Sequence, residues 1–225
     1  YTMIDFTAET KLSENQIHDL FSVEGAIFCD IGARIGEFSI PRANLCKEVY
    51  AFEPSPFNFP TLQDRAKQFG DKYKCFNVAF SDKDYDCVTP FKDCTNESEQ
   101  EIKYRTMEKF FADNNLDTPT FVKIDVEGME SQILKTMDFL FEKKVPIYTE
   151  IHYNNDSWGA THDFPDNPSF KSLNEGGFDF NKLKEYGYKV YNNIHQYSPT
   201  PMTLLAEDAD YNPPHPSHWG MLIVP

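Results

Sequence analysis

Residues 28–38 read Phe-Cys-Asp-Ile-Gly-Ala-Arg-Ile-Gly-Glu-Phe, and residues 49–54 read Val-Tyr-Ala-Phe-Glu-Pro. The pattern predicts two buried strands, with a glycine turn after the first and an acid at the end of the second. Gly32 and Gly36 lack the Cβ that would keep a ligand from the backbone. Glu53 lies 17 residues after Gly36, near the position at which a carboxylate accepts hydrogen bonds from ribose hydroxyls. The stretch therefore predicts an α/β fold that binds a nucleoside-containing cofactor.

The glycine turn also indicates which nucleoside cofactor fits. A dinucleotide site needs Gly-x-Gly-x-x-Gly so that the main chain can approach a pyrophosphate, whereas this turn has two glycines and a leading acid, Asp30. A carboxylate at that point repels phosphate and pairs with an ammonium group. S-adenosylmethionine has an amino group, a sulfonium cation and no phosphate, so it is the predicted cofactor. A nicotinamide-dependent oxidoreductase, which shares the strand, turn and acid, is the alternative.

The length of the chain fits one domain. Its 225 residues are 40% hydrophobic and 15% aromatic, which is enough for one substantial core. We expect a single domain over residues 1–225, with a leading helical segment at 1–24 and loop insertions near the acceptor site at 153–180 and 196–217. The first residue is Tyr1 rather than methionine. We expect a piece cut from a longer chain, fused to a glycosyltransferase or another biosynthetic domain, and a cleaved tag is the alternative.

The charge of the chain bears on its partners. Its 36 acidic and 21 basic residues give a formal net charge of −15. Such a surface repels polyanions, so we expect no nucleic-acid partner and favour a neutral or cationic acceptor. The five cysteines include no Cys-x-x-Cys pair, which favours a reduced protein. The sequence shows neither a membrane span nor a secretion signal, and we expect a cytoplasmic location.

Hydrophobic patterning predicts alternating strands and helices along the chain. The predicted strands cover residues 26–31, 48–52, 74–80, 88–91, 121–125, 146–151, 188–194 and 218–224. The predicted helices cover residues 58–69, 107–111, 129–142 and 182–186. Residues 93–101 are polar and acidic, and we expect a loop there.

A second group of polar residues follows two of these strands. Residues 122–130 read Val-Lys-Ile-Asp-Val-Glu-Gly-Met-Glu, which places Asp125 at the end of a buried strand in which Lys123 is the one charge. The next strand ends with Glu150 and His152. Because the carboxyl ends of parallel strands open on one side of a sheet, we expect these groups around the same crevice as the acids of the first stretch.

These groups suit methyl transfer to a hydroxyl. The displacement needs the acceptor hydroxyl aligned behind the sulfonium methyl, and it needs the hydroxyl proton removed. His152 is the candidate base, because a neutral imidazole is available at physiological pH, and Glu150 or Asp125 can orient it. Alternatively, Asp125, Glu150 and His152 bind Mg²⁺ or Mn²⁺, which would acidify the hydroxyl directly. The spacing in the sequence leaves both interpretations open.

Four motifs carry a resemblance to a known family. They are Asp-Ile-Gly-Ala-Arg-Ile-Gly at 30–36, Phe-Glu-Pro at 52–54, Lys-Ile-Asp-Val-Glu-Gly-Met-Glu at 123–130 and Glu-Ile-His at 150–152. Over residues 26–195 the sequence resembles the FkbM family of S-adenosylmethionine-dependent methyltransferases. The resemblance implies a Rossmann-like class I methyltransferase fold, with a seven-stranded, mostly parallel sheet, an antiparallel last strand and helices on both faces. It also implies O-methylation of sugars, polyketides or related small molecules.

The resemblance implies roles for individual residues. Catalytic roles are expected for Asp125, Glu150 and His152. Arg34 stands where the family commonly has asparagine, and its guanidinium can instead pair with the methionine carboxylate of the cofactor. Asp82, in a turn, is a candidate contact to the adenine amine or an acid that bonds its own backbone. The expected cofactor contacts are Asp30, Gly32, Ala33, Arg34, Gly36, Glu53, Asp82 and Asp125.

The segment 153–180 indicates the class of acceptor. It is rich in aromatic residues, asparagine and aspartate. Sugar C–H faces pack on aromatic rings while sugar hydroxyls bind amides and carboxylates, so we expect a carbohydrate acceptor, a deoxyhexose such as rhamnose in a glycan or glycoconjugate. A non-catalytic glycan-binding domain is a further alternative.

Overall fold

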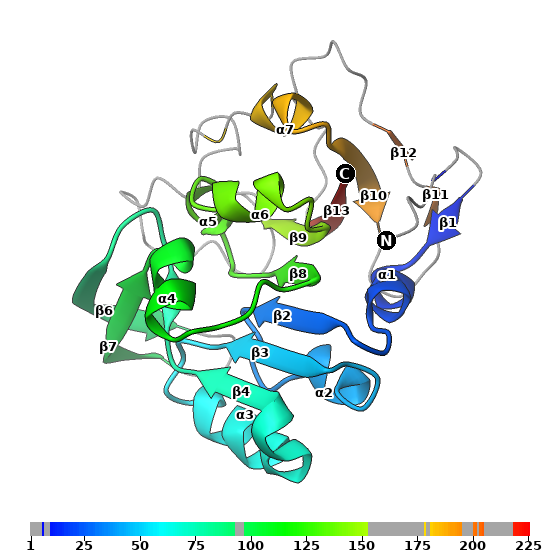
Figure 1. Ribbon diagram of the computed structural model, residues 1–225. Coiled ribbons are helices and arrows are strands. Elements are labelled where there is room, and N and C mark those ends of the chain that lie inside the picture. Colours follow the sequence, from blue (N-terminus) through cyan, green and yellow to red (C-terminus); the bar gives the residue numbers. More distant parts are fainter. Residues whose placement is uncertain are drawn as a thin grey trace.

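The computed structural model describes residues 6, 10–92, 97–152, 178, 181–194, 200–201, 203–204 and 218–225. A central sheet organises the molecule (Figure 1). The strands of this sheet are β2 Ile27–Ile31, β3 Glu48–Phe52, β4 Tyr73–Phe76, β8 Phe121–Ile124, β9 Ile147–His152, β10 Lys189–Ile194, β12 Thr203–Leu204 and β13 His218–Val224. They lie in the order β12-β10-β13-β9-β8-β2-β3-β4.

The directions of the strands match the prediction. Strands β4, β3, β2, β8 and β9 pair in parallel, one beside the next. The last strand, β13, runs antiparallel to both β9 and β10. Without the two-residue β12, which pairs antiparallel with β10, this is the predicted seven-stranded sheet with a reversed last strand. The predicted Rossmann-like sheet is therefore confirmed.

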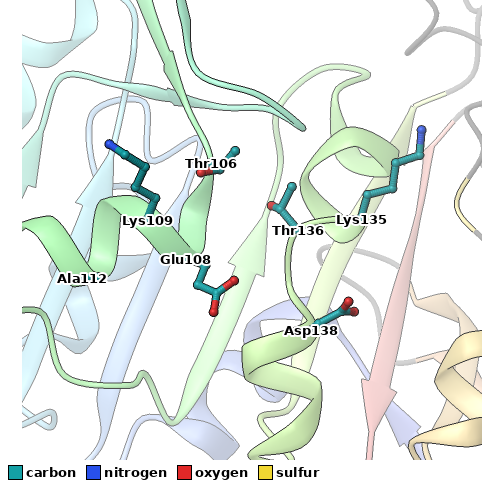
Figure 2. A pocket seen from close by; sticks show the side chains of 7 residues that line it. All are labelled: Thr106, Glu108, Lys109, Ala112, Lys135, Thr136 and Asp138. Atoms are coloured by element: carbon teal, nitrogen blue, oxygen red, sulfur yellow. The ribbon is translucent and has the colours of Figure 1, made fainter.

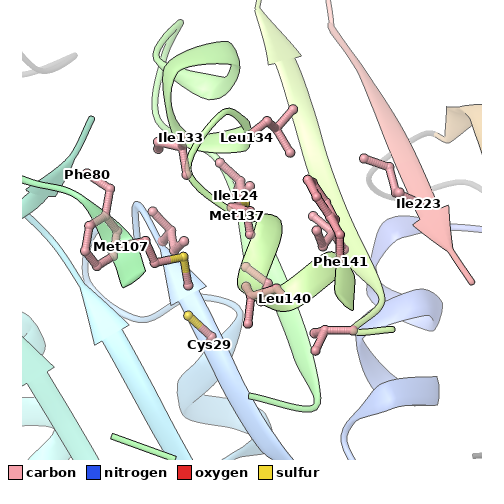
Figure 3. Close-up of a cluster of buried hydrophobic side chains, with 14 of the residues drawn as sticks. Cys29, Phe80, Met107, Ile124, Ile133, Leu134, Met137, Leu140, Phe141 and Ile223 are labelled. Atoms are coloured by element: carbon pink, nitrogen blue, oxygen red, sulfur yellow. The ribbon is translucent and has the colours of Figure 1, made fainter. Parts of the chain in front are cut away.

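Helices cover both faces of the sheet. The helices are α1 Glu14–Phe21, α2 Ser39–Arg42, α3 Asn58–Ala66, α4 Met107–Asp113, α5 Glu130–Leu134, α6 Asp138–Glu142 and α7 Asn181–Glu185, with a 3₁₀ helix at Lys67–Lys72. Side chains of α4 to α7 share one hydrophobic cluster with the sheet (Figure 3), and side chains of α1 and α3 share the other. Every residue of β2 and β8 is buried, as expected for parallel strands that are covered on both faces.

The predicted strand at 74–80 is wrong, because it divides after Phe76. The side-chain amide of Asn77 donates to the carbonyls of Glu53 at 2.9 Å and Pro54 at 3.1 Å, which ends the pairing of β4 with β3. The chain then enters β5 (Ala79–Phe80), which belongs to a separate three-stranded sheet of order β5-β7-β6.

The loop predicted at 93–101 is wrong over 97–101, and residues 93–96 lie outside the described residues. Strand β7 (Glu97–Arg105) starts inside it and pairs antiparallel with the whole of β6 (Tyr85–Lys92). Among the β7 side chains that the structure describes, Ile102 alone is buried. Backbone pairing rather than burial forms this strand, so a polar sequence without alternation concealed it.

The single helix predicted at 129–142 is two helices, α5 and α6. The amide and hydroxyl of Thr136 both donate to the carbonyl of Ile133, at 2.9 Å each. The amide of Met137 donates to Leu134, again three residues back. A threonine that bonds the preceding turn in this way competes with the regular helical pattern, and the helix breaks there.

The predicted insertions are described only in part. The segment 153–180 lies outside the described residues except for Phe178, which is buried beside Phe141. Within 196–217 the structure shows β11 (Thr200–Pro201), paired with β1 (Lys11–Leu12), and β12, so this segment is not a loop throughout. None of the helices in the described part of the chain has the length and apolar character that crossing a membrane requires.

Candidate active site

The turn after β2 lies against the end of β8. The amides of Gly32 and Ala33 donate to the carbonyl of Phe52, at 2.9 and 3.0 Å. Gly32 has φ +80°, and a Cβ there would lie 1.7 Å from the carbonyl oxygen of Asp125. At Gly36, φ is +81° and a Cβ would lie 2.5 Å from a side-chain carbon of Ile40. The packing of the protein itself therefore requires both glycines, whereas the sequence suggested ligand approach as the reason.

Glu53 joins the end of β3 to this turn. Its carboxylate accepts hydrogen bonds from the amides of Arg34 and Ser55, both at 2.7 Å. Burial raises the pKa of Glu53 to about 7, against the lowering effect of these two bonds. The acid and the glycine turn thus come together, as predicted from the sequence.

Asp30 is fully enclosed. One carboxylate oxygen, Oδ2, accepts from the Ser39 hydroxyl at 2.5 Å, and the Ser39 oxygen in turn lies 2.7 Å from the Tyr73 hydroxyl. The other oxygen, Oδ1, lies 3.5 Å from Nζ of Lys123 and has no hydrogen-bond partner among the described residues. In this structure Asp30 pairs with a lysine in the interior rather than lying open to a ligand.

The ammonium group of Lys123 lies beside two of the acids at the strand ends. It lies 3.2 Å from Oδ2 of Asp125 and 4.5 Å from the centre of the Phe38 ring. Burial lowers the pKa of Lys123, but the charges of Asp125, Asp30, Glu14 and Glu150 outweigh burial and raise this pKa above its usual value. Asp30 and Asp125, two of the acids that the sequence predicted around one crevice, therefore lie within 3.5 Å of one buried cation.

Three predicted residues have less clear surroundings. Asp82 is exposed, and its carboxylate accepts a hydrogen bond from the Ser81 hydroxyl at 3.3 Å. Arg34 has φ +50°, and its half-exposed side chain donates to Glu37 at 3.0 Å. His152 is the last residue of β9 and pairs through its backbone with His218, while its side chain lies outside what the structure describes.

A second buried pair, on α1, adjoins the cluster. Nε2 of His18 lies 3.0 Å from Oε1 of Glu14, and both side chains are enclosed. Burial, and then the charge of Arg42, hold the pKa of His18 well below its usual range, so the imidazole is neutral. Burial raises the pKa of Glu14 to about 7, with Lys123 opposing. This pair was not predictable from the sequence, because both residues are polar members of an ordinary amphipathic helix.

The metal hypothesis gains no support from the site. Among the side chains that the structure describes, no group of three histidine, cysteine, aspartate or glutamate residues could hold a metal ion. Asp30 and Asp125 lie 3.5 and 3.2 Å from the Lys123 ammonium instead, which supplies the positive charge that a metal would bring.

A groove of about 410 Å³ lies elsewhere, between the start of α4 and the α5–α6 break (Figure 2). None of the predicted site residues lines it. Two of its charged residues are in ion pairs: Lys109 lies 2.7 Å from Asp113, and Asp138 pairs with Lys182. The groove is lined by Thr106, Glu108, Lys109, Ala112, Lys135, Thr136 and Asp138.

The family model of the methyltransferase FkbM domain matches residues 30–190, which include the glycine turn and all the strand-end acids. The chain belongs to the FkbM methyltransferase family. Membership of this family counts against the nicotinamide-dependent alternative. No curated protein matches this FkbM methyltransferase.

Solved structures resemble this FkbM methyltransferase in fold. The FkbM methyltransferase from Methylobacillus flagellatus KT superimposes with a TM-score of 0.58 at 16% identity, over 95% of this chain and 48% of that one. This chain thus spans about half the length of that relative. A putative methyltransferase from Streptococcus mutans, in complex with SAH, has a TM-score of 0.48 at 11% identity, over 92% of this chain and 95% of that one. At 16% identity the likeness to the Methylobacillus protein shows the fold alone.

Proposed function

We propose that this FkbM methyltransferase transfers the methyl group of S-adenosylmethionine to a hydroxyl of a carbohydrate, a deoxyhexose such as rhamnose. One observation carries the proposal. Glu53 is bonded to the glycine turn after β2, and the Asp125 backbone packs against the same turn. A carboxylate for a ribose and a carboxylate for an amino group therefore flank one turn.

The chain's own residues fit the two ends of the cofactor. Each Glu53 oxygen accepts one backbone amide and keeps a further lone pair for a ribose hydroxyl. Asp30 is enclosed, so we assign the amino group to Asp125, whose side chain is 20% exposed, and regard Asp30 as a buried counter-charge. When bound, S-adenosylmethionine supplies an electrophilic methyl group on a sulfonium cation.

The acceptor side follows from β9. His152, at the end of this strand, is the proposed base that takes the proton from the acceptor hydroxyl, and Glu150 stabilises the imidazolium that results. The segment 153–180 continues directly from His152, and its aromatic, asparagine and aspartate content supports a carbohydrate acceptor.

Calorimetry with S-adenosylhomocysteine (SAH), the spent form of the cofactor, tests the proposed cofactor site. We expect the wild-type protein to bind SAH and Glu53→Ala to bind it at least about tenfold more weakly, because two charge-assisted ribose hydrogen bonds are lost. Glu48→Ala is the matched control, since Glu48 starts the same strand and bonds Lys74 and Tyr50 instead. Equal SAH affinity in the wild type and Glu53→Ala would contradict the site.

Mass spectrometry of a panel of sugars incubated with S-adenosylmethionine tests the acceptor and the base. We expect one added methyl group on a deoxyhexose hydroxyl. His152→Ala should keep SAH affinity and lose turnover by about 100-fold or more. Full turnover in His152→Ala would remove the proposed base, and methylation of none of the sugars would refute the carbohydrate assignment.

A further inference from the structure

Lys123 is the one charge in a strand that is buried on both faces. It lies in β8 directly opposite Asp30 of β2, and 1% of the residue is exposed. An ammonium in such a place is costly unless carboxylates compensate it. The free-energy cost of burying this ammonium suggests a role beyond packing, since an apolar residue would pack there as well.

The Lys123 ammonium contacts two acids and one aromatic ring. The first acid, Asp30, accepts a hydrogen bond from the Ser39 hydroxyl and is wholly enclosed. The Phe38 ring covers the ammonium at 4.5 Å. The second acid, Asp125, accepts a hydrogen bond of 3.2 Å from the ammonium. The side chain of Asp125 is 20% exposed, whereas those of Asp30 and Lys123 are enclosed.

We infer that Lys123 is a positioning residue: anchored on Asp30 and covered by Phe38, its ammonium holds the Asp125 carboxylate toward the amino group of the bound cofactor. This inference rests on the proposed function. A carboxylate held in place before binding loses less conformational freedom on binding than one that turns in water. Asp30 then contributes through Lys123 rather than by touching the cofactor.

Two related ligands separate positioning from a merely structural role. SAH carries the amino-acid group, whereas 5′-methylthioadenosine has the same adenosine and thioether without it. We expect the wild type to prefer SAH by about tenfold or more, as a charged hydrogen bond allows. Lys123→Met should lower this preference by about tenfold through SAH alone, with methylthioadenosine affinity unchanged. In an Asp125→Asn background, Lys123→Met should change the preference no further, because the residue acts through Asp125.

Lys74→Met is the matched control. Lys74 also pairs with a carboxylate, Glu48 at 2.9 Å, and lies 5.2 Å from the ring centre of Tyr50, but at the opposite end of the strands. It should leave the ligand preference unchanged. Should Lys123→Met fail to fold, the double variant Lys123→Met/Asp30→Asn removes the buried pair without leaving a charge, and the same loss of preference is expected.

The outcomes are distinguishable. A wild type that binds neither ligand overturns the proposed function and the inference with it. A wild type that prefers SAH, with variants of Lys123 that keep or exceed this preference, overturns the inference alone. Equal weakening of both ligands in these variants would assign Lys123 a structural role and would also overturn the inference.

Discussion

The substitution Gly32→Ala tests the packing between the β2 turn and β8. Gly32 has φ +80°, and an added Cβ would lie 1.7 Å from the Asp125 carbonyl oxygen. That carbonyl has little freedom to move, because the amide of the same residue donates to Ile31 at 3.0 Å. Two costs follow: about 1–2 kcal/mol for an L-residue in the left-handed region and about 1–3 kcal/mol for the strain of overpacking.

Gly25→Ala isolates the second cost. Gly25 has φ +83°, nearly the same as Gly32, but a Cβ there would meet no atom within 4 Å. The conformational cost is therefore shared, and the difference between the two variants should be the overpacking alone, about 1–3 kcal/mol. Urea unfolding of the wild type and both variants, extrapolated to water, measures the two free energies.

Cofactor affinity extends the comparison. Gly32→Ala displaces Asp125, so it should also weaken SAH binding, whereas Gly25→Ala should leave SAH binding unchanged. Equal destabilisation by the two substitutions would refute the reasoning, because it would mean that the turn and the end of β8 are not in contact.

Three further predictions concern charge and backbone strain. SAH affinity should rise about tenfold from pH 6 to pH 8 as Glu53 ionises with a pKa of about 7, and calorimetry of Glu53→Gln should show no such rise. The stability that Glu14 contributes should be full below its unfolded pKa of 4.5 and lost as the pH rises through about 7. The difference in unfolding free energy between the wild type and Glu14→Gln should therefore shrink by up to about 3 kcal/mol over that interval. A constant difference in urea unfolding would contradict this. Arg34→Asn should stabilise by up to about 1 kcal/mol in urea unfolding, because asparagine tolerates φ +50° better and the exposed pair with Glu37 contributes little; a loss of stability would count against it.

The sequence predicted the parts of the fold that depend on burial. The runs at 27–31, 48–52 and 121–124 are apolar because parallel strands are covered on both faces, and they were found within a residue or two. Asp125 directly follows β8, and Glu150 lies in the neighbouring parallel strand β9, one residue beyond the pair formed by Ile124 and Thr149. The polar β7 and the break at Thr136 were not predictable in this way, since hydrogen bonds rather than hydrophobic patterning determine both.

The candidate site was predictable in its members more than in their roles. Lys123 gave a signal, as the one charge in an apolar strand, but the sequence could not show that Asp30 and Asp125 lie on either side of its ammonium. The contact of Gly32 with the Asp125 carbonyl joins residues 93 positions apart, and a turn motif says nothing about such a neighbour. Roles that arise from contacts between strands need the register of the sheet.

A crystal structure of the protein with SAH tests the central claim most directly. We expect the ribose hydroxyls on the Glu53 carboxylate, the adenosine beside the turn at 32–36, and the amino group on Asp125. SAH bound in the groove between α4 and α6, or anywhere apart from that turn, would contradict it.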